Sequence, residues 1–163
     1  LIGRSYAAAI ERRTKKTHIN DNFYEYVIKE FIKFNKRNNF DKKLDQLKKK
    51  SFSQETLKEI LSLHYELIRF FDKLTGQEKR SLASKYLHFH IPIFPIYDSR
   101  AKNSIGKIVK GRTLKNIGDK QYSKFCEKIL FLYNYIKEQT GKTPTLREID
   151  TFLIKNANDR LDK

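Results

Sequence analysis

The sequence predicts an all-α protein. Apolar residues recur at helical spacing in several segments, capping residues or glycines flank those segments, and no run longer than four residues alternates cleanly between apolar and polar side chains. The chain has 163 residues with only three prolines and six glycines, which argues against an all-β or fibrous protein. We expect a single helical domain over residues 1–163, in which residues 1–20 form a flexible N-terminal segment.

The N-terminal half is expected to contain two long helices. Residues 21–37 are predicted to be helical because apolar residues recur at helical spacing, with Asp21 as the N-cap and Asn38–Asn39 as the stop. A second helix is predicted from Ser53 to Leu74 and is broken by Thr75–Gly76. The run Lys48–Lys50 between them is interpreted as a solvated linker.

Four shorter helices are predicted to follow. The third runs from about Gln77 to His90 and stops before Pro92, because a proline disfavours helical backbone at the residue before it. After the extended segment 92–97, Asp98 is expected to cap a helix over residues 99–110 that ends at Gly111. The fifth helix is centred on residues 125–136, where Cys126 is expected in the core, and ends at Thr140–Gly141. A capping box from Thr145 to Glu148 opens the sixth.

Composition excludes several classes of function. One cysteine rules out a disulfide framework, and no His, Cys or carboxylate cluster has zinc-site spacing, so we expect neither a metal nor another cofactor. No apolar run approaches the roughly 20 residues of a membrane span, and nothing reads as a signal peptide. We therefore expect a cytoplasmic, nucleoid-associated protein with no membrane partner.

The net charge of +16 indicates nucleic acid as the first partner to test. Residues 99–124 hold eight basic residues and one acid, Asp119, which a generally lysine-rich composition does not explain. Their lysines and arginines are suited to bind phosphates with release of counterions. The DNA-binding residues predicted here are Ser99, Arg100, Lys102, Lys107, Lys110, Arg112 and Lys115.

Residues 74–101 resemble a known family. A helix, a turn containing Gly76, a second helix, an extended approach and an Asp-capped helix follow one another, and residues 94–101 read FPIYDSRA. This is similar to the helix-hairpin-helix DNA glycosylases (8-oxoguanine glycosylase and endonuclease III-like), whose corresponding segment reads Pro-Val-Asp-Thr-His-Val. A bacterial group with a Ser-Lys-x-Leu-His-Phe and Phe-Pro-Ile-x-Asp-Ser pattern is also similar, and it shares the later segment 145–150.

The resemblance implies base excision, in which Asp98 stabilises the sugar cation and a lysine is the nucleophile of lyase-active members. Lys79, which lies 19 positions before Asp98, and Lys85 are the two candidate lysines. It also implies that the hairpin grips the DNA backbone at Gly76 and that a modified or damaged base is flipped into a pocket. The residues expected around that base are Tyr86, His88, Phe89 and Tyr97.

Other interpretations stay open. Asp98 also fits a purely capping role, and Glu78 replaces the second hairpin glycine of the family with a charge that repels phosphate. These features favour a non-catalytic DNA-binding module on the same scaffold. A phage-defence protein acting on modified DNA, or an interaction subunit with an acidic partner, are further alternatives.

Overall fold

The computed structural model describes residues 23–110 and 117–159 and is all-helical there, as the sequence predicts. The expected flexible segment 1–20 lies outside the described residues, as does the N-cap residue Asp21. The first described helix, α2 (Phe23–Asn38), matches the predicted one closely. It ends where Asn39 adopts a left-handed backbone with φ of 50°.

A helix that the sequence analysis did not predict, α3 (Phe40–Leu47), follows immediately. Phe40, Leu44 and Leu47 recur at helical spacing and are all buried, so the core holds this helix despite its short length. The predicted linker is therefore reduced to the residues after Leu47, where Lys48–Lys50 are exposed as expected.

The helices α4 (Gln54–Thr75) and α5 (Arg80–His90) form a pair joined by a short turn. Ser53 caps α4 in a capping box with Thr56, and Gly76 ends the helix in a left-handed conformation. The helix α5 begins three residues later than predicted. The Thr75 hydroxyl accepts a hydrogen bond from the Gln77 amide (3.3 Å), which keeps the intervening residues in the turn.

The remaining helices are α6 (Ser99–Ile108), α7 (Lys120–Thr140) and α8 (Leu146–Asn158). Asp98 caps α6 and the Thr145–Glu148 capping box opens α8, both as predicted. The helix α6 stops two residues early because Val109 is already extended. Asp119 caps α7 through the Tyr122 amide, which extends that helix beyond its predicted N-terminal end.

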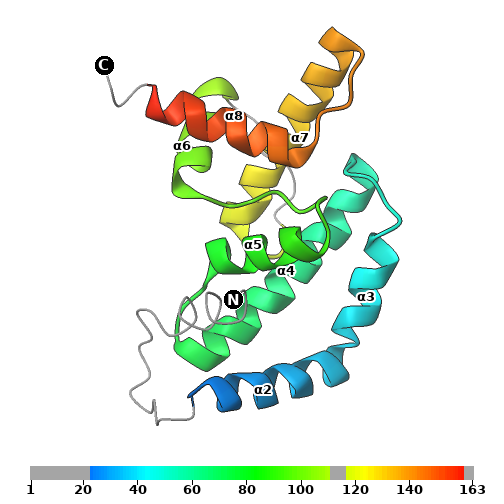
Figure 1. The fold of residues 1–163 in the computed structure, drawn as a ribbon, viewed down its shortest axis with the longest axis vertical. Coiled ribbons are helices and arrows are strands. Elements are labelled where there is room, and N and C mark those ends of the chain that lie inside the picture. Colours follow the sequence, from blue (N-terminus) through cyan, green and yellow to red (C-terminus); the bar gives the residue numbers. More distant parts are fainter. Residues whose placement is uncertain (1–22, 111–116, 160–163) are drawn as a thin grey trace.

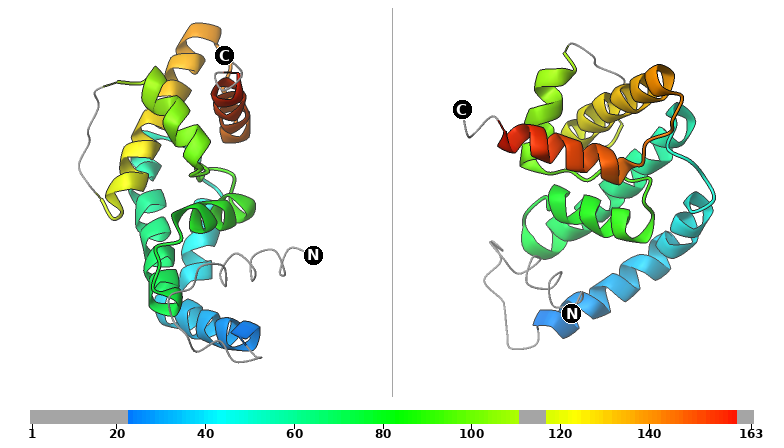
Figure 2. Two further views of the ribbon diagram at one scale, coloured as in Figure 1. Left: turned by 90° about the vertical axis from the view of Figure 1, so that its left-hand side faces the viewer. Right: turned by 45° about the horizontal axis from the view of Figure 1, so that its top comes forward.

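Figure 1 shows α2 and α3 flanking the long α4 from below and from the right, while α6, α7 and α8 gather above it. The turned views in Figure 2 show α8 lying beside α6, in agreement with the extensive contact between these two helices. The helix α7 packs against both α4 and α6 and so joins the group of α6, α7 and α8 to α4.

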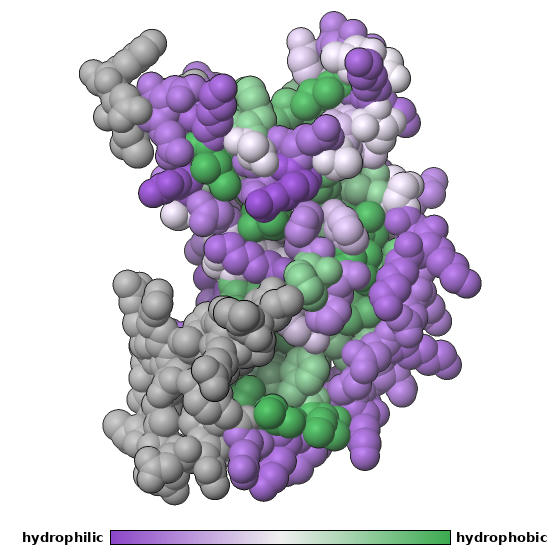
Figure 3. Space-filling view, viewed as in Figure 1, coloured by the Kyte–Doolittle hydropathy of each residue, from purple (hydrophilic) through white to green (hydrophobic). Residues whose placement is uncertain are grey.

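The core runs through all seven described helices. Its fully buried side chains include Phe40, Ile60, Leu67, Leu87 and Phe94. Cys126 is buried in it, as expected. In Figure 3 hydrophilic side chains cover the outer flank around α3 and the hydrophobic ones gather toward the middle of the face. None of the described helices is both long and apolar enough for a bilayer crossing.

Candidate functional site

The segment 91–98 between α5 and α6 is hydrogen-bonded to α5 and to α7. The Tyr97 amide donates to the Ser84 hydroxyl of α5 (2.9 Å), and Nδ1 of His88 lies 2.8 Å from the carbonyl oxygen of Phe94. From α7, the Tyr122 hydroxyl donates to the carbonyl oxygen of Pro95 (2.8 Å). These contacts fix the backbone that leads to Asp98.

Asp98 is half-buried at the N-terminus of α6, where its Oδ1 accepts a hydrogen bond from the Arg100 amide (2.9 Å). Within the described chain Oδ2 of Asp98 takes part in no hydrogen bond, so capping uses only one oxygen of this side chain.

The charges of Arg147, Asp98, His88 and Lys85 all act on Asp150, and these five residues are hereafter the α5–α8 cluster. Asp150 is only 6% exposed, and its Oδ2 accepts a hydrogen bond from Nη1 of Arg147 (3.2 Å). Burial raises the pKa of Asp150 and the charge of Asp98 raises it further, whereas Arg147, His88 and Lys85 lower it. Asp150 was not among the predicted site residues.

The two candidate lysines lie at different places on α5. Lys85 is exposed and its charge acts on Asp150 together with that of Asp98. Lys79 is the N-cap residue of α5, next to the end at which Arg80 binds Asp119.

The four side chains predicted to surround a base have different surroundings in the structure. Tyr86 packs against the rings of Phe31 (5.8 Å) and His90 (4.5 Å), and Phe89 is 58% exposed. His88 belongs to the α5–α8 cluster. Tyr97 lines a cavity near the start of α6.

That cavity is a groove of about 290 Å³ between α6 and α7, hereafter the lysine groove. Its cations are Lys102, which was predicted to bind DNA, Lys124, which ends the predicted basic segment 99–124, and Lys128, which lies outside that segment. None of the three makes an ion pair within the described residues, so their charge is available to an anion. The rest of the lining is Tyr97, Ile105, Gln121 and Phe125.

The groove has an aromatic, hydrogen-bonding floor. The Tyr97 hydroxyl donates to Oε1 of Gln121 (2.9 Å), and burial raises the pKa of Tyr97, so the phenol keeps its proton. Lys102 follows Asp98 by one helical turn, and its amide bonds the Asp98 carbonyl (2.8 Å). The groove and the α5–α8 cluster thus both adjoin the start of α6.

The other predicted DNA-binding residues are scattered. Arg100 reaches toward α8, where its Nη1 contacts Oδ1 of Asn158 (3.4 Å), while Lys107 and Lys110 are exposed near the end of α6. Ser99 is the first residue of α6 and Gly76 ends α4. Arg112 and Lys115 lie outside the described residues.

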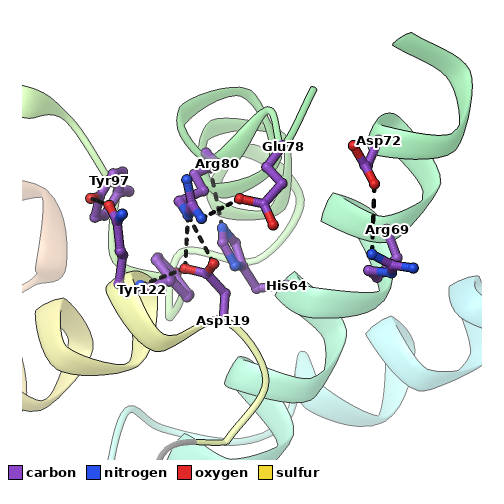
Figure 4. Close-up of polar contacts among 9 residues, drawn as sticks. His64, Arg69, Asp72, Glu78, Arg80, Tyr97, Asp119 and Tyr122 are labelled. Carbon is purple, nitrogen blue, oxygen red and sulfur yellow. Dashed lines mark hydrogen bonds and ion pairs between the residues drawn. The ribbon is translucent and has the colours of Figure 1, made fainter. Parts of the chain in front are cut away.

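A buried network holds the start of α5 against α4 and α7 (Figure 4). Nε of Arg80 donates to both carboxylate oxygens of Asp119 (2.9 and 2.8 Å), and Arg80 also pairs with Glu78. His64 of α4 lies with Nε2 3.3 Å from the Arg80 carbonyl and stacks on the ring of Tyr122 at 3.4 Å. Glu78 is therefore engaged within the turn between α4 and α5.

Burial lowers the pKa of His64 to about 3, which keeps its ring neutral in the folded protein. His64 is consequently a scaffold residue. Among the described residues no group of three or more His, Cys, Asp or Glu is arranged to hold a metal ion.

Comparison of the chain with protein families, curated proteins and solved structures finds no match. The geometry of the site and the sequence motifs therefore carry the functional argument.

Proposed function

We propose that this protein binds DNA and excises a modified or damaged base as an N-glycosylase. The observation that carries the proposal is the position of Asp98 at the N-terminus of α6, one helical turn before Lys102 of the cation-lined groove. Breaking a glycosidic bond builds positive charge on the sugar, and a carboxylate in a partly desolvated site stabilises that charge. A phosphate backbone is the polyanion that the three unpaired lysines fit.

Lys85 supports a lyase step in the same site. An amine that attacks the anomeric carbon must first lose its proton to a base or to solvent. The tyrosine and glutamine in the floor of the lysine groove offer a stacking face and hydrogen-bonding groups to a flipped nucleotide.

A non-catalytic DNA-binding module is the second candidate. Two observations favour it: one oxygen of Asp98 is already used to cap α6, and Glu78 brings a negative charge into the turn that the related glycosylases use to hold phosphate. Both candidates require DNA to bind, and they differ only in chemistry at Asp98.

The variant Asp98→Asn separates the two candidates. Asparagine caps a helix about as well as aspartate, so the variant keeps the fold and loses the charge. We expect base release from duplexes carrying deaminated, oxidised or alkylated bases to fall by about 100-fold or more, with DNA affinity retained. Asp159→Asn, the same charge change at the exposed end of α8, is the matched control.

Borohydride trapping completes this test by identifying the lysine. A covalent protein–DNA adduct is expected to survive Lys79→Ala and to be lost in Lys85→Ala. Undiminished base release by Asp98→Asn would contradict the glycosylase proposal, and bound DNA with no base released by the wild type would favour the module.

A further inference from the structure

A second groove lies between α2 and α4 and shares no lining residue with the lysine groove. Its volume is about 480 Å³, within the range of roughly 300–1,000 Å³ that is common for ligand sites. The rings of Phe34 and Phe70 lie 4.7 Å apart in its lining, and Phe70 and Leu74 are buried. This cavity, hereafter the α2–α4 groove, therefore has an apolar floor.

The two helices that form the groove run in opposite chain directions. Phe34 of α2 contacts Phe70 of α4, whereas Lys43, which comes later in the chain than Phe34, binds Glu66, which comes earlier in α4 than Phe70 (2.8 Å). In agreement, the start of α2 and the end of α4 both lie at the lower left of Figure 1. One end of the groove thus combines the start of α2 with the end of α4.

An exposed tyrosine marks each end of the groove. Tyr26 belongs to the first turn of α2 and so lies toward the end of α4, whereas Tyr65 precedes Phe70 and lies toward the end of α2. Tyr26 is 51% exposed and Tyr65 is 38% exposed. Aromatic side chains with this much exposure offer faces on which flat rings can stack.

Basic side chains follow each tyrosine at helical spacing. On α2, Lys33 and Arg37 are two and three turns after the first tyrosine, and on α4, Arg69 and Lys73 are one and two turns after the second. The spacing places each pair of cations on the same helix face as its tyrosine. Because the helices run in opposite directions, the cations of both walls lie between the two rings.

The two carboxylates that line the groove are already engaged. Glu30 accepts a hydrogen bond from Nζ of Lys33 (2.7 Å). Glu66 accepts two from Nζ of Lys43, which does not line the groove (2.8 and 3.0 Å). These acids therefore leave much of the positive charge of the groove unbalanced.

The arginines carry most of that unbalanced charge. Arg37 is exposed and makes no ion pair within the part of the chain that the structure describes. Arg69 lies 3.6 Å from Asp72, which is outside the lining, and this exposed contact is weak. Both guanidinium groups are available to an anionic ligand.

We propose that the α2–α4 groove binds a single-stranded segment of nucleic acid, whose phosphates contact Arg37 and Arg69 and whose bases stack on Tyr26 and Tyr65. Cations combined with exposed aromatic rings are the means by which proteins bind single strands without reading their sequence. A duplex hides its base faces, and an acidic peptide has no flat rings to stack, so neither uses the tyrosines. The inference does not depend on chemistry at Asp98, and it gives the protein a nucleic-acid surface separate from the lysine groove.

The fluorescence anisotropy of a labelled short oligothymidine tests the stacking. Tyr26→Ala is expected to weaken binding of this probe by about 10-fold, while Tyr26→Phe keeps the ring and stays within about twofold of the wild type. Tyr135→Ala is the matched control, because Tyr135 is also 51% exposed but lies on α7 and does not line the groove. Equal affinities of Tyr26→Ala and Tyr135→Ala would overturn the inference.

The salt dependence of the same binding tests the phosphate contacts. Arg37→Ala is expected to make the slope of log affinity against log salt shallower by about 0.7, the value for one phosphate contact on a single strand. Lys142→Ala, at an exposed cation between α7 and α8, is the control and is expected to leave the slope unchanged. An unchanged slope in Arg37→Ala would contradict the proposed contact.

Two further measurements identify the site and the ligand class. Single-strand binding is expected to survive replacement of the three groove lysines by alanine; its loss there, with no loss in Tyr26→Ala, would overturn the inference and assign the strand to the lysine groove. Unlabelled oligothymidine is expected to displace the probe far better than an oligoglutamate of equal charge. Equal displacement by both would show that the rings take no part and would also overturn the inference.

Discussion

Arg80 and Asp119 form the most consequential ion pair of the described chain. Asp119 is buried with a 7% exposed side chain and accepts both the Arg80 guanidinium and the Tyr122 amide. Removing one partner of such a pair leaves a charge without compensation in a low-dielectric setting. The pair joins the first turns of α5 and α7, which lead to the cluster and to the lysine groove respectively.

Asp119→Asn is expected to lower the free energy of unfolding by about 2–4 kcal/mol, since asparagine still caps α7 but no longer balances Arg80. The exposed pair of Arg69 and Asp72, 3.6 Å apart, provides the control (Figure 4). Asp72→Asn is expected to cost less than about 1 kcal/mol. Urea unfolding curves measure the free energy of unfolding of both variants. Equal decreases in the two would mean that the buried ion pair stabilises the fold no more than the exposed one.

His64 makes stability depend on pH in a predictable direction. Its pKa is about 3 in the folded protein, against an ordinary value of 6.5, so the unfolded chain takes up the proton first on acidification. The contribution is complete above pH 6.5 and is lost between pH 6.5 and 3, at about 1.4 kcal/mol per pH unit. We expect His64→Gln to show a correspondingly shallower fall in stability between pH 6.5 and 5. Parallel curves for the variant and the wild type would contradict this.

At the scale of the helices, the approach of α7 to α4 depends on a glycine. Gly118 has φ of +68°, and a Cβ there would lie 2.9 Å from Cβ of Tyr65 and 3.3 Å from the Leu61 carbonyl oxygen. Gly141 at the other end of α7 has nearly the same φ, +67°, but nothing within 4 Å of the added atom. Both glycines therefore adopt a left-handed backbone, but only Gly118 lies too close to its neighbours for a side chain to fit without a shift.

Gly141→Ala is therefore expected to cost about 1 kcal/mol from the left-handed backbone alone. Gly118→Ala is expected to cost roughly 1–3 kcal/mol more, because the backbone carbonyl and the Tyr65 stem must shift. Thermal or urea unfolding of the two variants measures the difference. Similar decreases in stability for both variants would show that α7 and α4 can move apart at little cost.

The helices that were predicted well carry long periodic apolar runs and local caps. Ser53, Asp98 and the Thr145–Glu148 box mark helix starts by local hydrogen bonds, which a sequence displays directly. The helix α3 was missed because it is only eight residues long and lies next to a lysine run. Its stability comes from burial of Phe40, Leu44 and Leu47 in the core, and so short a segment does not display this burial in its sequence.

At the scale of the whole molecule, the charge of +16 is spread over many elements, but the lysine groove concentrates part of it at the start of α6 and along α7. Within this region, Asp98 was predicted as a site residue from the family resemblance and Lys102 from the basic segment. Lys128 and Asp150 were not predicted, because they are brought to this region by the packing of α7 and α8, and those contacts join residues far apart in the sequence.

DNA binding is expected to weaken with added salt, and the lysine groove is expected to account for a measurable part of the effect. Replacing Lys102, Lys124 and Lys128 together by alanine should reduce the slope of log affinity against log salt by about 2–3. The matched control replaces Lys48, Lys49 and Lys50, the exposed run after α3, which should change the slope little. Binding titrations across a range of salt concentrations compare the two triple variants, and equal changes would rule out a special role for the groove.

The chain's single cysteine gives the core a chemical reporter. Cys126 is buried in α7, between the groove lysines of that helix and its contact with α4, and burial raises the pKa of its thiol. A thiol reagent in solution therefore reacts only with molecules in which α7 has transiently separated from the helices packed against it and exposed Cys126. The labelling rate of the unmodified protein, followed with and without DNA, measures how often the groove comes apart and how far a bound strand holds it closed.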